Sequence, residues 1–200
     1  MPAVRELAGE PGKPDEPSKP DSPGAASFSA LRIVAFLALF MLLSMAWASL
    51  AGPALHQWVI EHMTVAPAAQ LLGWLDPQLG VSAQGNRLQA EGGGLRVSGG
   101  CEGVDMALLL ISGALCAAVG WRARMLGLVL GSALVFALNQ ARILGLFYAF
   151  RHNRELFDLL HTVLMPLAMV LVIGGFFIVW LGAVSRAAPS RAPANAKPAR

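Results

Sequence analysis

Long apolar stretches separated by polar segments dominate the pattern of the chain. They cover approximately residues 31–51, 104–120, 125–150 and 163–184. A helix needs roughly 20 apolar residues to cross the hydrocarbon core of a bilayer. Lipid offers the backbone no hydrogen-bond partner, so each crossing segment must be helical. The pattern therefore predicts an all-α integral membrane protein with about four transmembrane helices. The second stretch is the shortest, and we expect its helix to extend back through Glu102 and Cys101.

The segments outside these stretches differ in composition. Residues 1–27 contain six prolines among Gly, Ser and charged residues. Such a segment cannot bury enough apolar surface to offset its ordering, which predicts a disordered tail. Its first apolar run also begins too late for a signal peptide. Residues 185–200 are rich in Ala and Pro and purely basic, and they form a second predicted tail. Residues 28–184 are then one membrane-embedded domain.

The segment of residues 52–100, between the first two apolar stretches, is large enough for structure of its own. Residues 56–75 place apolar side chains at helical spacing among polar ones, which predicts a helix at the membrane interface. Pro67 is expected to interrupt it. Residues 87–98 alternate around a run of three glycines and predict a short β-hairpin.

Charge supports a membrane protein and predicts its orientation. The chain is 56% hydrophobic and only 14% charged, whereas soluble proteins carry about 25%. A net charge of +3 could indicate a nucleic-acid partner, but the basic residues lie in tails and short loops, so we expect none. With the N-terminus inside, ten Lys and Arg lie in inner segments: Arg5, Lys13, Lys19, Arg32, Arg122, Arg124, Arg186, Arg191, Lys197 and Arg200. Four lie in outer loops: Arg87, Arg96, Arg151 and Arg154. This asymmetry predicts that both termini are cytoplasmic.

Arg142 lies inside the third apolar stretch. A charged side chain there costs about 2.5–3.5 kcal/mol, so a functional role is expected. It stands eight residues before Phe150, roughly 12 Å from that end of the span, which is deep for a side chain that merely reaches the interface. Asn139, three positions earlier, shares its helix face. One interpretation is an active site; the alternative is a non-enzymatic membrane subunit in which Arg142 and Asn139 make polar contacts between helices.

Residue counting from the predicted turns finds two partners at the depth of Arg142. From the inner turn near Arg122, Arg142 is twenty residues forward and Cys101 is twenty-one back. From the outer turn near His152, Arg142 is ten residues back and His161 is nine forward. If the spans are antiparallel neighbours, Cys101, Arg142 and His161 share one level within roughly 3 Å.

These three residue types can form a thiol-based catalytic site. A cation lowers the pKa of a cysteine thiol, histidine can exchange its proton, and arginine stabilises a thiolate or an oxyanion. Glu102 and Asp105 oppose this, because neighbouring carboxylates raise a thiol pKa. Cys116 would lie roughly 22 Å along the same helix, too far for a disulfide.

Other kinds of site are not predicted. His56, His62 and His152 lack ligand spacing with one another, so we expect no metal and no cofactor. The absence of a Cys-x-x-Cys pair argues against a membrane thiol oxidoreductase.

Three motifs together resemble a known family. Ser98-Gly-Gly-Cys-Glu-Gly-Val104 at the start of a span, Asn139-Gln-Ala-Arg142 inside the next, and His161 opening the last are similar to the exosortase/archaeosortase family. The match covers roughly residues 99–180, and the small size resembles the exosortase H subgroup.

The resemblance implies an activity and a site. Exosortases are membrane cysteine proteases or transpeptidases of the bacterial inner membrane. They act at its periplasmic face on exported proteins that end in a short motif, a span and a basic tail. By motif position, the resemblance implies that Cys101 is the nucleophile, that Arg142 and His161 are the other catalytic residues, and that Gly103 and Asn139 support them. Family members with more spans carry N-terminal helices that this chain lacks.

Overall fold

The computed structural model describes residues 23–187 of the 200-residue chain. The helices are α1 (Pro23–Leu50), α2 (Pro53–Val59), α3 (Ala66–Leu75), α4 (Val104–Cys116), α5 (Trp121–His152), α6 (Arg154–Leu159) and α7 (Met165–Ala187). Short irregular turns are the π-helical η1 (Ile60–Val65) and η3 (Leu160–Leu164) and the 3₁₀ turn η2 (Pro77–Leu79). The strands are β1 (Ser82–Gln84), β2 (Arg87–Gln89) and β3 (Leu95–Arg96).

The predicted tails lie largely outside the described residues. Residues 1–22 and 188–200 are not described, while residues 23–27, expected to be part of the N-terminal tail, are the first turn and a half of α1. In the C-terminal tail, residues 185–187 continue α7. Both flanking helices are thus longer than the apolar pattern predicted, because apolarity marks the lipid-facing part of a helix and not its full length.

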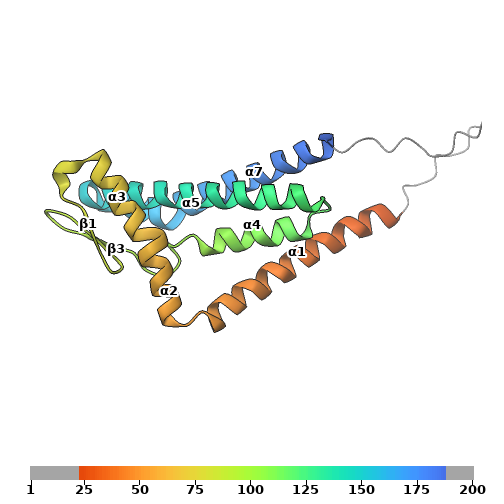
Figure 1. Ribbon diagram of the computed structural model, residues 1–200, viewed down its shortest axis with the longest axis horizontal. Helices are drawn as coiled ribbons and strands as arrows, with labels where there is room; N and C mark the ends of the chain where they lie inside the picture. The colour runs from red at the N-terminus through yellow and green to blue at the C-terminus, as the bar shows by residue number, and fades with distance from the viewer. Residues whose placement is uncertain (1–22, 188–200) are drawn as a thin grey trace, which may run out of the picture.

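Helices α4, α5 and α7 form a closely packed bundle, and α1 packs along α4 (Figure 1). Glycines permit the close approach. A Cβ atom on Gly127 of α5 would lie 2.4 Å from a ring carbon of Trp180 in α7. A Cβ on Gly131 would lie 2.6 Å from Leu110 of α4. In lipid, where all surfaces are apolar, such dense packing is what holds helices together.

Within the described residues, three helical segments are long and apolar enough to cross a membrane: Ala30–Leu50, Trp121–His152 and Arg154–Ala187. Within the predicted span at 104–120, the apolar helix α4 has 13 residues and is about 20 Å long, so the count of four spans stays a prediction. The expected extension through Glu102 and Cys101 is wrong. Gly103 precedes α4 with φ 76°, a left-handed conformation that breaks helical geometry, so Cys101 and Glu102 lie in a loop.

The segment between α1 and α4 folds over one end of α5. Val65, Leu72 and Leu88 from this segment are buried against Ile143 and Phe147 of α5. The three short strands form one antiparallel sheet in the order β1-β2-β3, with Leu88 paired to Leu95. The strands β2 and β3 fall in the region where a hairpin was predicted, and β1 adds a strand that the pattern did not predict.

Pro67 was predicted to interrupt the helix, and the π turn η1 separates α2 from α3 just before it. Residues 53–75 stay helical, because the chain widens into the π turn η1 just before the proline. The N–H of Ala66 bonds to the carbonyl of Glu61, five residues back, instead of four. The wider turn accommodates Pro67, which has no N–H to donate to a preceding carbonyl.

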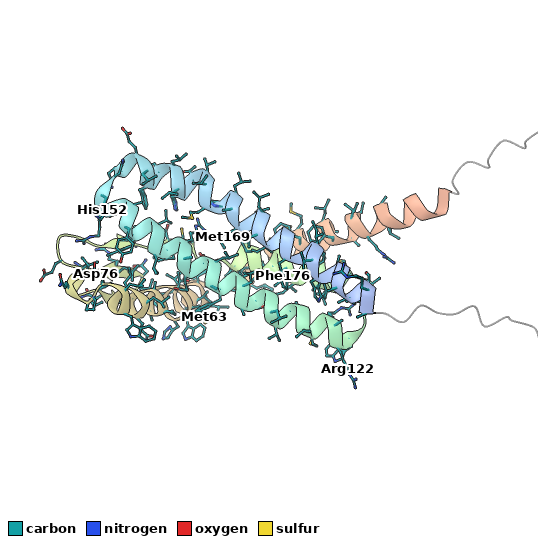
Figure 2. The ribbon with its side chains drawn as sticks, turned by 90° about the horizontal axis from the view of Figure 1, so that it is seen from above. Met63, Asp76, Arg122, His152, Met169 and Phe176 are labelled. Carbon is teal, nitrogen blue, oxygen red and sulfur yellow. The ribbon has the colours of Figure 1, made fainter. Side chains whose placement is uncertain are left out.

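The two ends of the molecule differ in content. The described chain begins and ends at the same end, where α1 starts and α7 stops (Figure 1). The sheet and α3 occupy the opposite end. Figure 2 places His152 and Asp76 at this sheet end and Arg122 at the other.

Candidate active site

Cys101 lies in the short loop that joins the sheet to α4. Its N–H bonds to the carbonyl of Ser98 at 3.2 Å, which closes a tight turn. Gly100 and Gly103 on either side have φ values of 89° and 76°, which L side chains adopt only with strain. The glycines of the motif therefore allow the loop to present Cys101 toward α5, where its side chain is 6% exposed.

The structure brings together the three residues that residue counting placed at one level. The Sγ of Cys101 lies 3.9 Å from Nδ1 of His161 and 3.8 Å from Nη2 of Arg142. They come from three different segments: the loop before α4, the middle of α5, and η3. The thiol thus has an imidazole and a guanidinium in contact with it, one able to take its proton and one able to stabilise its negative charge.

Arg142 is buried, with 8% of its surface exposed, and donates from Nη1 to the carbonyl of Gly100 at 3.4 Å. Its Nε atom has no partner among the described residues. Both contacts go to the cysteine loop and not to a neighbouring transmembrane helix. The side chain therefore holds the loop that carries Cys101 and keeps one donor unused in the site.

His161 is held by its neighbours in the helical segment Arg154–Ala187. Its ring stacks on Phe157 one turn earlier, with centroids 5.5 Å apart and planes 3° apart. It belongs to η3, where the N–H of Met165 bonds to the carbonyl of Leu160, five residues back. Pro166 follows directly, so a π turn again precedes a proline. The helix is thus widened by one residue just before Pro166, as it is before Pro67.

Gly103 and Asn139, the two predicted supporting residues, are in direct contact. A Cβ on Gly103 would lie 3.0 Å from Cγ and 3.2 Å from Oδ1 of Asn139. Asn139 is 2% exposed, and its Oδ1 has no hydrogen-bond partner among the described residues. The motif asparagine therefore packs against the cysteine loop and leaves an unused acceptor within the site.

Gln140 is a polar residue whose role the sequence did not reveal. It is 3% exposed, and its Nε2 donates to the carbonyl of Met63 in η1 at 3.0 Å. Met63 stands four residues before Pro67, which has no N–H to donate to the Met63 carbonyl. The sequence shows Pro67 in a predicted helix and the amide of Gln140 beside Asn139. Nothing in the sequence indicates that this amide bonds to the helix that contains the proline.

The surroundings of Cys101 favour the neutral thiol at rest. Burial raises the pKa of the Cys101 thiol above its ordinary value of 9.0, the charge of Arg142 lowers it, and the carboxylate of Glu102 raises it; the net effect is upward. The predicted opposition between Arg142 and Glu102 is present, but desolvation is the larger influence. A base must therefore remove the thiol proton during any reaction, and His161 is in contact with it.

The remaining residues considered earlier lie outside this cluster. The Nδ1 atoms of His56, His62 and His152 lie 2.9–3.0 Å from the carbonyls of Ala51, Trp58 and Tyr148 respectively. No group of three metal-ligating side chains occurs among the described residues. Cys116 is a free, half-buried thiol at the far end of α4.

Comparison with known proteins identifies the family. No curated protein and no solved structure matches the chain. The family model described as transmembrane exosortase (Exosortase_EpsH) matches residues 24–178, which include the cysteine loop, α5 and His161. Because this match covers most of the sequence, the chain belongs to the transmembrane exosortase family.

Proposed function

We propose that the protein is a membrane cysteine protease or transpeptidase that cleaves C-terminal sorting signals of exported proteins. The observation that carries the proposal is the contact of the Cys101 sulfur with both His161 and Arg142, at 3.9 and 3.8 Å. Membership of the exosortase family supports the reaction class. The contact supports a separate role for each of the three residues.

The reaction begins with proton transfer from the Cys101 thiol to Nδ1 of His161, because the thiol is neutral at rest. The thiolate then attacks the carbonyl carbon of the scissile peptide bond. A carbon–sulfur bond forms, and the carbonyl oxygen becomes an oxyanion. Arg142 stays charged throughout, so it stabilises first the thiolate and then the oxyanion.

The tetrahedral intermediate collapses with cleavage of the carbon–nitrogen bond. His161 returns its proton to the leaving amine, which is the span-bearing C-terminal piece of the substrate. The other product stays on Cys101 as a thioester. Water or an acceptor amine then attacks the thioester carbonyl, and His161 takes the proton of that nucleophile. The carbon–sulfur bond breaks, and His161 returns the proton to the departing thiolate, which regenerates the thiol of Cys101. Hydrolysis and transpeptidation share every step up to the thioester.

The substrate class and the sidedness belong to the proposal. Substrates are exported proteins that end in a short motif, a span and a basic tail. The cysteine loop lies toward the sheet end, opposite the end where the described chain starts and stops (Figure 1). The excess of Lys and Arg predicts that the latter end is cytoplasmic, which supports an active site at the periplasmic face of the bacterial inner membrane. Assignment to the exosortase H subgroup stays a prediction from size.

The experiment is processing of a tagged substrate in cells that carry single variants. Cys101→Ala, Arg142→Ala and His161→Ala should each abolish processing while the protein still reaches the membrane. Cys116→Ala is the matched control, because it removes the other cysteine and should process normally. Full processing in all three site variants would exclude the proposal.

The alternative is a non-enzymatic membrane subunit in which Arg142 and Asn139 serve only as polar contacts between helices. Under that alternative, Cys101→Ser should have no phenotype, whereas Arg142→Ala should reduce assembly. The bonds of Arg142 favour the enzyme, because both go to the cysteine loop.

A further inference from the structure

A hollow of about 600 Å³ lies between α1, α4 and α7, at the end of the bundle away from Cys101. It exists because α4 ends at Cys116, whereas α1 and α7 run on beside the connecting residues 117–120. Its wall is almost wholly apolar and includes Ile33, Phe36, Leu110, Phe177 and Leu181. Gly174 of α7 also lines it, and a Cβ there would meet nothing within 4 Å.

The size of the hollow suits a small ligand. Its volume of about 600 Å³ falls in the range of roughly 300–1,000 Å³ that small ligands fill. In a bilayer, the small apolar ligand at hand is the acyl chain of a lipid.

Charge at the mouth selects among lipids. Arg32 of α1 lines the hollow on the side where α7 ends, and Arg186 follows the lining residue Ser185. Arg124 donates to the carbonyls of Ala114 and Ala117, both at 3.0 Å, so a third cation borders the connecting loop. Among the described residues, no Asp or Glu lines the hollow. Guanidinium groups bind phosphate well, and basic pockets between transmembrane helices on the cytoplasmic side bind anionic headgroups.

We propose that this hollow is a binding site for an anionic phospholipid, with an acyl chain between α1 and α7 and the phosphate beside Arg32. The lipid fills the space that the short α4 leaves open. It thereby connects α1, which packs mainly along α4, to α7. The proposal is independent of the chemistry at Cys101.

The test is thermal unfolding of the full chain in detergent with added phosphatidylglycerol or phosphatidylcholine of the same acyl chains. The wild type should gain about 5–10 °C in Tm at a phosphatidylglycerol concentration near 100 times Kd. Phosphatidylcholine should give a clearly smaller shift. Gly174→Leu fills the hollow and should abolish the phosphatidylglycerol shift. Gly175→Leu is the matched control, because Gly175 also has open space around it but does not line the hollow.

Arg32→Gln tests the headgroup contact separately and should make the two lipids equivalent. Equal shifts with both lipids in the wild type would overturn the proposal. So would a phosphatidylglycerol shift that survives in Gly174→Leu. A disulfide between Cys116, which lines the hollow, and a cysteine placed in a substrate's span would show a peptide occupant and would overturn it as well.

Discussion

Gly103 and Asn139 stand so close that a Cβ on the glycine would lie 3.0 Å from Cγ of the asparagine. One residue begins the helix after Cys101, and the other stands one turn before Arg142. Their contact sets the distance between the loop that carries the thiol and the helix that carries the cation. The site therefore depends on a residue without a side chain as much as on those with reactive groups.

Gly103→Ala should lower processing strongly while leaving membrane insertion intact. The left-handed φ costs a non-glycine residue about 1–2 kcal/mol, and the new methyl group must displace Asn139 or the cysteine loop. Processing of a tagged substrate measures the effect, and Gly99→Ala is the control. Gly99 has open space around it and no positive φ. Equal activity of the two variants would show that the contact does not matter.

The link between Gln140 and Met63 should be dispensable once Pro67 is replaced. Gln140→Leu removes the side-chain donor to the carbonyl of Met63 and should lower the free energy of unfolding by about 0.5–1.5 kcal/mol. Pro67→Ala supplies a backbone N–H four residues after Met63. In that background Gln140→Leu should cost less, which thermal unfolding of the four variants measures as a coupling. Additive costs would mean that the proline and the amide act independently.

Neutralising Arg142 and neutralising Glu102 should shift the pH dependence of Cys101 alkylation in opposite directions. Because the pKa of the Cys101 thiol is raised above 9.0, its alkylation by iodoacetamide should still be increasing with pH at pH 9, measured in a Cys116→Ala background. Arg142→Gln removes the cation that lowers the pKa and should move the profile to higher pH. Glu102→Gln removes the carboxylate that raises it and should move the profile to lower pH. Identical profiles in both variants would contradict the electrostatic account.

The raised pKa of the Cys101 thiol also determines whether the folded protein becomes more or less stable as pH rises. A thiol whose folded pKa lies above the unfolded value keeps its proton longer in the folded state. Its contribution to stability is therefore fully present below the unfolded pKa of 9.0 and is lost as pH rises through the folded pKa.

The packing of α5 on α7 should leave no room for a side chain at position 127. A Cβ there would lie 2.4 Å from the ring of the buried Trp180, so Gly127→Ala should lower the Tm of the purified protein. Gly145→Ala is the control on the same helix, because its Cβ would meet only the flexible end of Met165 at 3.0 Å. Similar thermal stability of the two variants would show that the close approach at Gly127 is not required.

From the sequence, the common depth of Cys101, Arg142 and His161 could be predicted, but the backbone conformation around them could not. Arg142 and His161 could be related by counting because α5 and the helix after it meet in a turn at Asn153, whose side chain accepts from the N–H of Leu156 at 3.1 Å. The loop conformation of Cys101 could not be predicted, because a glycine before an apolar run reads equally as part of a helix. The contact of Gln140 with Met63 joins residues 77 positions apart, and no local pattern reports such a pair.

If Cys101 is the nucleophile, it becomes covalently attached to the substrate through a thioester. The most direct measurement is mass spectrometry of the purified protein after brief exposure to a substrate that carries motif, span and basic tail. We expect an adduct on the peptide containing Cys101 that hydroxylamine removes and that Cys101→Ala lacks. Processing of the same substrate by Cys101→Ala, without any adduct in the wild type, would contradict this expectation.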